Sequence, residues 1–352
     1  MRKTIASLKP YKVKPEFGMI RLDNNEAFKS LLSEVDFSKL QKTLINRYPA
    51  ESTEALEKAF GRFAGFPSEN VLAGNGSDEW ISLISQYVLE PGDRVLVLDP
   101  DFSMYEKNAT IMGASVMTIP LPEDFSFPLE KVAEEIQRAK PSLMFLSNPN
   151  NPTGKLYEEQ VLEEVISELR NVGGILVLDE AYMDFAGESP FARKVLEYDN
   201  LIILRTASKA LGMAALRLGF LIACDRIIEE IGAIKPPYNV NTVSAQIGAE
   251  LLEKPELLDG FLVAQLVQIT ELEDILKEFA SANEGVELVP SSTNFFLMKM
   301  ENPGALGDFL YERNIKIRVF DRAVRISAGT KEEHERLRAA LKEWSESYAK
   351  SS

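Results

Sequence analysis

Short apolar runs alternate with segments of helical period through the middle of the chain. RVLVLDP, SVMTIP, SLMFLSNP and GGILVLDEAY have the composition of buried strands, and amphipathic stretches such as YEEQVLEEVISELR lie between them; LIILRT and LRLGFLIAC close the series. Short apolar strands separated by helices form βαβ units, whose sheets are covered by helices on both faces. The sequence therefore predicts an α/β fold with a mostly parallel central sheet.

The Pro236-Pro237 pair interrupts a helical pattern and indicates a boundary. Beyond it come long charged helices, then the strands GVELVPS, NFFLMKM, IKIRVF and AVRISAG, and a final helix through KEEHERLRAALKEW. We therefore predict a large domain at 31–236 and a smaller α+β domain at 237–352. Residues 1–30 lack a clear period, so we expect an N-terminal arm that packs on another domain or subunit.

Charge and composition exclude several classes of function. The chain has 352 residues and a formal net charge of −15, which argues against a nucleic-acid or anionic-membrane partner because both require a basic field. One cysteine, Cys224, and one histidine, His334, exclude an internal disulfide and a Cys/His metal site. The basic start is followed by no apolar h-region, and no apolar stretch reaches the length of a membrane span, so we expect a cytoplasmic protein without a metal.

Polar side chains follow the predicted strands where these end, at the sheet edge where ligands bind in open parallel sheets. Asp179 ends ILVLD and Tyr182 follows it, Asn148 ends FLSN, and Lys209 follows LIILRT. Pyridoxal phosphate requires a lysine amine for a Schiff base and a carboxylate facing its pyridine nitrogen. Lys209 and Asp179 fit these two roles, and Asn148 and Tyr182 suit the ring hydroxyl.

The cofactor phosphate requires backbone amides at a helix N-terminus and a fixed cation. AGNGSDEWISL places a Gly-rich turn directly before a helix, and Arg217 follows Lys209 by eight residues. Taken singly, each feature has an ordinary structural explanation: a strand-end Asp is often a helix cap, and GNGSD is commonly a turn. Their occurrence together, at the ends of successive strands, favours the cofactor site.

With GNGSDE, PDFSMY, SNPNNPTG, LDEAY, TASKALGMAALRLGF and VRISAGT, the chain resembles the class I and II aminotransferases of fold type I over essentially its whole length. The resemblance implies that Lys209 forms the Schiff base and shuttles the proton, that Asp179 faces the pyridine nitrogen, and that Asn148 and Tyr182 contact the ring hydroxyl. It also implies a homodimer with shared active sites, in which Tyr48 of INRYPA reaches the phosphate of the neighbouring subunit's cofactor.

The same resemblance assigns the remaining cofactor contacts. Tyr105 of PDFSMY is expected to stack on the cofactor ring, although a core tyrosine is an alternative for this position. Ser77 and Asp78 are expected to offer backbone amides to the phosphate, and Ser208 and Arg217 are expected to add side chains.

Within this family the chain is most similar to the histidinol-phosphate aminotransferases, through LKPY, LDNNEAF, NRYP and IKIRVFDRAVRISAGT. That similarity implies amino transfer between histidinol phosphate and 2-oxoglutarate, with Tyr11, Arg318 and Arg325 holding the anionic end of the substrate. Asn148 is also expected to contact the substrate. Planar guanidinium groups suit both a phosphate and a carboxylate. For Arg318, an exposed strand position is the competing interpretation.

The arm departs from the family pattern at one place, because the usual N-E-N-P is Asn25-Glu26-Ala27-Phe28 here. This departure concerns the substrate and leaves the cofactor residues untouched. An aromatic amino acid aminotransferase and a threonine-phosphate decarboxylase share the same framework and stay open as alternatives. A catalytically silent fold type I protein is a further alternative, against which the arginine pair argues.

Overall fold

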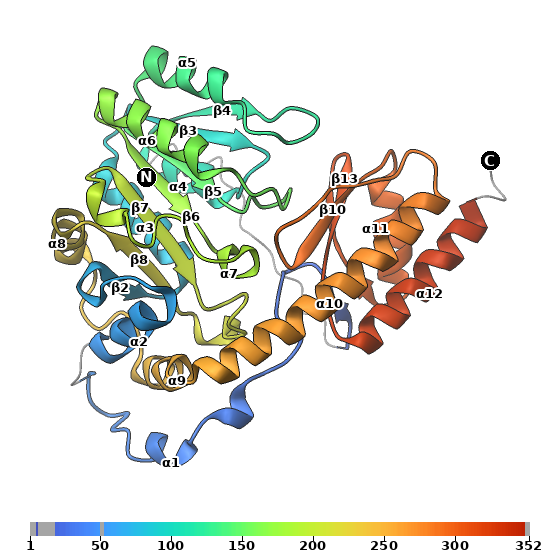
Figure 1. Ribbon diagram of the computed structural model, residues 1–352, viewed down its shortest axis with the longest axis horizontal. Helices are drawn as coiled ribbons and strands as arrows, with labels where there is room; N and C mark the ends of the chain where they lie inside the picture. The colour runs from blue at the N-terminus through green and yellow to red at the C-terminus, as the bar shows by residue number, and fades with distance from the viewer. Residues whose placement is uncertain (1–4, 6–17, 50–52, 349–352) are drawn as a thin grey trace.

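The protein is described here from a computed structural model covering residues 5, 18–49 and 53–348. Of the three β-sheets, the seven-stranded one and the four-stranded one lie on opposite sides of the molecule. The long helix α10 (Pro255–Ala282) extends from the side of the first to the side of the second (Figure 1). No helix in these ranges has the length and apolar character needed to cross a membrane.

The large sheet has seven strands in the order β2-β8-β7-β6-β5-β3-β4. Strands β3 to β7 pair in parallel, whereas β8 is antiparallel to both β7 and β2. The segment 207–218 between β7 and β8 holds only a three-residue helical turn, too little for the crossover that parallel pairing needs. The predicted α/β class is thus confirmed. The strands are β2 (Val71–Gly74), β3 (Arg94–Asp99), β4 (Ser115–Pro120), β5 (Leu143–Ser147), β6 (Ile175–Asp179), β7 (Leu201–Thr206) and β8 (Gly219–Ala223).

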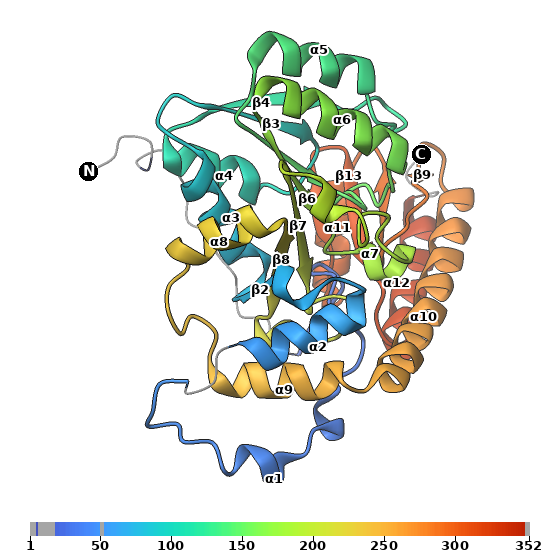
Figure 2. The same ribbon diagram turned by 60° about the vertical axis from the view of Figure 1, so that its left-hand side comes forward.

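Helices cover both faces of the large sheet (Figure 2). Successive strand residues point to opposite faces, so Val177 packs in one apolar cluster while Leu176 and Leu178 pack in the other. One face is covered by α3 (Gly76–Val88), α4 (Met104–Met112) and α8 (Asp225–Ile234). The other face is covered by α2 (Glu54–Ala64), α5 (Leu129–Ala139), α6 (Glu159–Val172) and α9 (Thr242–Leu252).

The small sheet is antiparallel, with four strands in the order β12-β13-β10-β9, and forms a second apolar core with α10 and the last two helices. Its elements are β9 (Glu287–Leu288), β10 (Phe295–Lys299), α11 (Pro303–Glu312), β12 (Arg318–Phe320), β13 (Ala323–Ser327) and α12 (Lys331–Tyr348). They match the predicted strands and final helix, except that IKIRVF divides into β11 (Ile315–Lys316) and β12.

The change from one core to the other falls inside α10. Leu258 and Phe261, near its start, pack with the large sheet, and so does α9, whereas Leu272 and Phe279 pack with the small sheet. The packing of the large sheet thus continues past Pro236-Pro237. The division of the chain at 236 stays a prediction.

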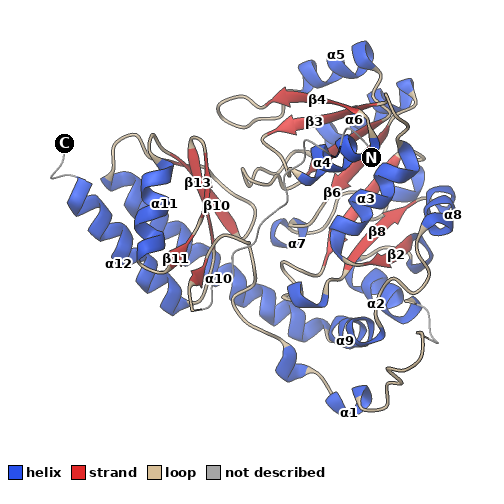
Figure 3. Ribbon diagram, turned by 180° about the vertical axis from the view of Figure 1, so that it is seen from behind, coloured by secondary structure: helices blue, strands red, loops and turns tan. Residues whose placement is uncertain are grey.

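The described part of the arm joins the small sheet's side of the molecule (Figure 3). β1 (Ile20–Arg21) pairs in parallel with β11, and Ile20 and Leu22 are buried in the second core. The chain then runs along α9, where the backbone N–H of Asp36 donates to Glu250 and the hydroxyl of Thr43 donates to Gln246 (Figure 1). Two short helices precede α2, namely η2 (Leu32–Glu34) and α1 (Phe37–Leu40). The short helices between the strands of the large sheet and its neighbouring helices are η3 (Ser68–Asn70), α7 (Met183–Ala186), η4 (Val195–Glu197) and η5 (Ala214–Leu216).

The only histidine is buried where β13 turns into α12. The backbone N–H of Gly329 donates to Nε2 of His334 at 2.9 Å, and Nδ1 lies 3.4 Å from a carboxylate oxygen of Glu271 on α10. Burial lowers the pKa of His334, while Glu271 opposes this effect. An imidazole that accepts at Nε2 must leave that nitrogen unprotonated.

This arrangement predicts a loss of stability in mild acid. The unfolded chain takes up a proton at the ordinary histidine pKa of 6.5, whereas the folded protein resists it, so stability is complete above that pH and falls as the pH drops below it. The slope is at most about 1.4 kcal/mol per pH unit. We expect His334→Gln to remove this component from the free energy of unfolding measured by denaturant titration between pH 7 and pH 5. Equal slopes in the two proteins would contradict the prediction.

Candidate active site

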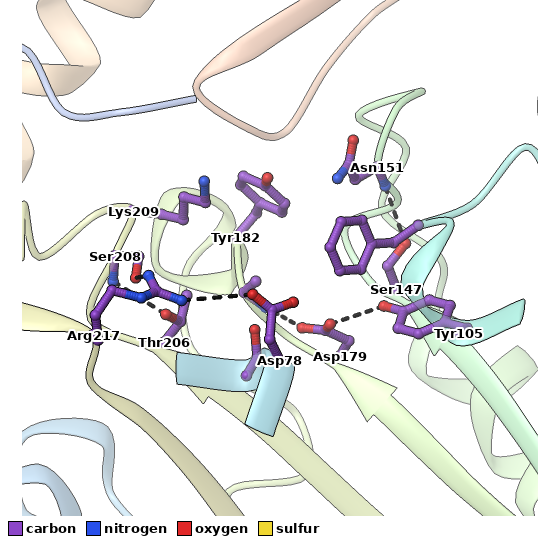
Figure 4. A pocket seen from close by; sticks show the side chains of 13 residues that line it. Asp78, Tyr105, Ser147, Asn151, Asp179, Tyr182, Thr206, Ser208, Lys209 and Arg217 are labelled. Atoms are coloured by element: carbon purple, nitrogen blue, oxygen red, sulfur yellow. Dashed lines mark hydrogen bonds and ion pairs between the residues drawn. The ribbon is translucent and has the colours of Figure 1, made fainter. Parts of the chain in front are cut away.

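A hollow of about 130 Å³ opens at the carboxyl end of the parallel strands (Figure 4). In this view Arg217, Ser208 and Thr206 lie on one side and Asn151 on the other, with Tyr182 between them. Eight of the predicted site residues line the hollow: Ser77, Asp78, Tyr105, Asp179, Tyr182, Ser208, Lys209 and Arg217. Three of them, Asp179, Tyr182 and Lys209, were predicted from their places after strands, and the others from the phosphate argument and the family resemblance.

Lys209 follows β7, and its half-buried amine faces the hollow. Nζ donates to the backbone carbonyl of Asn24 at 2.9 Å and lies 5.8 Å from the ring centroid of Tyr182. Because Lys209 and Tyr182 sit at the ends of different strands, the amine and the phenol face the same space. A lysine amine that faces a ligand hollow suits imine chemistry.

Asp179 ends β6 and is only 4% exposed. Burial raises the pKa of its carboxyl to about 6, and the hydroxyl of Tyr105, which donates to Oδ2 at 2.8 Å, opposes this effect together with the backbone N–H of Ala181. A buried carboxylate favours a positive partner beside it. Asp179 is thus suited to hold a protonated ring nitrogen.

The other end of the hollow has the features of an anion site. α3 begins at Gly76, which has φ +76°, and a Cβ atom there would lie 2.7 Å from Nη2 of Arg217. Arg217 reaches Asp78 at 3.5 Å and the hydroxyl of Ser208 at 3.5 Å. Helix N-terminal amides, hydroxyls and a guanidinium are the groups that a phosphate binds.

The structure moves the ring-stacking prediction from Tyr105 to Phe102. Tyr105 is 1% exposed, its ring stacks on Phe145 with centroids 4.9 Å apart, and its hydroxyl is bonded to Asp179. Phe102 lies at the start of the same segment and lines the hollow. We therefore propose Phe102 as the aromatic that covers a ring in the hollow, while the hydroxyl of Tyr105 holds Asp179.

The ring-hydroxyl prediction for Asn148 also changes. Asn148 is 1% exposed, its Oδ1 accepts the backbone N–H of Tyr157 at 2.7 Å, its Nδ2 is buried, and it is not among the residues that line the hollow. Asn151, in the same SNPNNPTG motif, does line it, and Nη1 of Arg325 donates to its Oδ1. With that oxygen engaged, the Asn151 NH₂ group is the part that can donate to a ring oxygen. We therefore propose Asn151 in this role.

Arg325 connects the hollow to the small sheet. It lies on β13, is buried, and donates to Asn151 and, at 2.7 Å, to the backbone carbonyl of Asp23. Arg318 on β12 is directly opposite Arg325 in the antiparallel register, so both side chains leave the same face. Arg318 is exposed, which agrees with the alternative interpretation of this residue as an exposed strand position.

Of the two remaining predicted tyrosines, the structure describes only Tyr48, which does not line the hollow of its own chain. Tyr48 is 80% exposed, and its ring stacks on that of Tyr238 with centroids 5.2 Å apart. Tyr11 lies outside the described residues. Tyr48 therefore faces away from the cofactor residues of its own chain.

Sequence reasoning also missed Thr206 and Ser147, which line the hollow beside the predicted residues. Thr206 ends β7, so the strand-end rule applied to it as it did to Asp179. Ser147 ends β5, and its Oγ accepts the backbone N–H of Asn151 at 3.0 Å. The signal was thus present in the sequence at both strand ends.

The assembled groups fit pyridoxal phosphate. They supply an amine, a buried carboxylate, an aromatic ring and an anion site around one hollow. Among the residues that the structure describes, no group of three or more His, Cys, Asp or Glu side chains could hold a metal ion.

Comparison with known proteins gives a consistent result. Residues 21–341 match the family described as aminotransferase class I and II. A histidinol-phosphate aminotransferase of Clostridium novyi is 38% identical over 342 residues, which cover 95% of this chain and 94% of that protein. One from Pyrococcus furiosus is 36% identical over 349 residues, which cover 97% of each chain.

Solved structures share the fold. The histidinol-phosphate aminotransferase of Sinorhizobium meliloti, in complex with pyridoxal-5'-phosphate, has a TM-score of 0.87 at 23% identity and covers 99% of this chain and 98% of that one. The L-threonine-O-3-phosphate decarboxylase of Porphyromonas gingivalis has a TM-score of 0.75 at 22% identity, covering 93% of this chain and 100% of that one. At these identities the likeness concerns the fold alone.

Proposed function

The chain belongs to the class I and II aminotransferases, and we propose that it moves an amino group between histidinol phosphate and 2-oxoglutarate. Its cofactor is pyridoxal phosphate. The observation that carries the substrate proposal is the bond between buried Arg325 and Asn151, which brings an anion-binding guanidinium to the edge of the cofactor hollow. Relatives named for this activity, similar to the chain over nearly its whole length, support it.

We assign the cofactor contacts by the chemistry of each side chain. Arg217, Ser208 and the N-terminal amides of α3 hold the phosphate, and Phe102 covers one face of the ring. Tyr182 and Asn151 donate to the ring oxygen. When bound, pyridoxal phosphate supplies an electron-withdrawing ring that stabilises negative charge on the substrate carbon bearing the amino group.

Two residues control the protons of the reaction. The Asp179 carboxylate holds the proton on the ring nitrogen, which keeps the ring electron-withdrawing. The Lys209 amine would act as the base that takes the proton from the substrate carbon bearing the amino group, because its Nζ faces the same hollow. Its 2.9 Å bond to the Asn24 carbonyl brings this residue of the arm next to the amine.

The donor is tested by supplying the purified protein with histidinol phosphate, phenylalanine or threonine phosphate, each with 2-oxoglutarate, and measuring glutamate. We expect glutamate with histidinol phosphate at a rate far above that with the other two. Glutamate with phenylalanine alone would favour an aromatic aminotransferase, and carbon dioxide from threonine phosphate would favour the decarboxylase. Either outcome would overturn the proposed donor.

Arg325→Gln is expected to lower kcat/KM for both substrates by about 100-fold, because a buried charge-assisted pair to phosphate or carboxylate is lost. The protein should still bind cofactor and show its absorbance band, since Arg325 is assigned to the substrate. Arg318→Gln, on the exposed partner strand position, should cost less than about 10-fold by steady-state kinetics. A larger loss for Arg318 than for Arg325 would reverse the two assignments.

We also propose that a second copy completes the site. Leu44, Ile45 and Tyr48 are 68%, 86% and 80% exposed, and Tyr238 beside them is 59% exposed. An exposed apolar surface of this kind is typical of a subunit interface. Tyr48 then reaches the partner's cofactor phosphate. Sedimentation should give a dimer, and Tyr48→Phe should weaken cofactor binding; a monomer that is fully active would contradict both.

A further inference from the structure

Three consecutive residues of the arm each contact a different residue of the proposed site. The carbonyl of Asp23 accepts from Arg325 at 2.7 Å, and the carbonyl of Asn24 accepts from Lys209 at 2.9 Å. The side-chain Nδ2 of Asn25 donates to the hydroxyl of Tyr182 at 2.8 Å. Of these contacts, only the last is made by a side chain and is therefore specific to the residue type.

Asn25 is held firmly in place. It is 2% exposed and adopts φ +56°, a conformation that asparagine tolerates better than most residues. Its backbone N–H donates to Oγ of Ser327 at 3.0 Å, and Asn294 donates to its carbonyl at 3.2 Å. Ser327 belongs to β13, two residues after Arg325, so the strand that carries the substrate arginine also fixes Asn25.

The bonds around Asn25 fix the direction of the bond to Tyr182. Ser327 Oγ already accepts the Asn25 backbone N–H, and it donates its own hydrogen to Asn25 Oδ1 at 2.8 Å. The Asn25 amide therefore presents its NH₂ group to Tyr182. A phenol oxygen that accepts from an amide keeps its own hydrogen for another acceptor. The Tyr182 hydroxyl can therefore donate its hydrogen to an acceptor in the hollow that Tyr182 lines.

We infer that Asn25 is a positioning residue that makes Tyr182 a hydrogen-bond donor toward the cofactor's ring oxygen. The inference rests on the proposed function, because it needs a ring oxygen in the hollow. It adds to the role of Tyr182 a cause that lies in the arm, at the asparagine that this chain shares with the N-E-N-P pattern. A series of contacts then joins the substrate anion site to the ring. It runs from Arg325 along β13 to Ser327, and from there through Asn25 to Tyr182.

The test uses the full-length protein loaded with pyridoxal phosphate and follows the pH midpoint of the cofactor's visible absorbance. A hydrogen bond donated to the ring oxygen stabilises its negative charge, so the loss of that bond moves the midpoint upward. Asn25→Asp keeps the shape and tolerates the same φ, but a carboxylate oxygen accepts from Tyr182 and reverses the bond. We expect an upward shift of about one pH unit.

A double variant separates positioning from added charge. A Tyr182→Phe protein has no hydroxyl to redirect, so in it Asn25→Asp changes the pH midpoint only through the added charge. The shift of the midpoint should therefore be clearly smaller than in the wild-type background. Asn25→Gly, which retains positive φ without the amide, should move the midpoint less than Asn25→Asp and should not move it at all in the Tyr182→Phe protein.

The outcomes separate the inference from the function on which it rests. Equal shifts for Asn25→Asp in the two backgrounds, or no shift in either, would overturn the role of Asn25 while the cofactor assignment stood. A wild-type protein that develops no visible band with pyridoxal phosphate would overturn the proposed function and this inference with it.

Discussion

Lys209→Ala is expected to abolish the visible cofactor band and to lower turnover by about 10⁴-fold or more, because one side chain supplies both the nucleophile and the proton-transferring base. Absorbance spectra and glutamate formation measure the two effects. The variant should fold normally, since the amine makes one described hydrogen bond, to the carbonyl of Asn24. A small primary amine added to the buffer should restore part of the activity by replacing the missing base.

Lys131→Ala is a matched control, because Lys131 is exposed on α5 and does not line the hollow. It should retain the band and the full rate. If Lys209→Ala kept both its band and its turnover, the cofactor would have to be bound through another lysine, and the assignment of the hollow would fail.

Asp179→Asn is expected to leave the cofactor bound but to slow proton removal from the substrate carbon by about 10²- to 10³-fold, the scale found when one preorganised polar group is removed. Asparagine keeps the shape of the side chain and still accepts from Tyr105, but it cannot hold the ring nitrogen protonated. Exchange of the substrate proton with heavy water measures this step directly.

Tyr105→Phe provides the comparison for that experiment. It removes the 2.8 Å bond to Asp179 and leaves the carboxylate in place. We expect a loss of about 10-fold or less, on the scale of one hydrogen bond to a charged group. A Tyr105→Phe protein slower than Asp179→Asn would indicate that the phenol, and not the carboxylate, faces the ring.

The periodicity of the sequence was sufficient to predict the large sheet and to locate the strand ends that carry Asp179 and Lys209. Parallel pairing places such ends at one edge whatever the loops do, so residues directly after a strand could be located without coordinates. The small sheet was predicted as strands, but its role in bringing Arg325 to Asn151 depends on tertiary packing. The local sequence pattern therefore could not predict that contact.

The corrections within motifs have one physical cause. Phe102 and Tyr105 are three residues apart where α4 begins, and Asn148 and Asn151 are three apart in an irregular loop. Both Phe102 and Tyr105 line the hollow, whereas of the two asparagines only Asn151 does. How each side chain is presented depends on the backbone direction at a turn, which composition does not report. The arm shows the same limit, because the contact of Asn25 with Tyr182 joins residues 157 positions apart.

The half-reaction tests the central claim most directly. Cofactor-loaded protein is mixed with histidinol phosphate in the absence of 2-oxoglutarate, and the oxo product is counted by mass spectrometry. An aminotransferase should release one equivalent per subunit and then stop, and added 2-oxoglutarate should yield an equal amount of glutamate. Release of no product, or continued release without the oxo acid, would contradict amino transfer at this site.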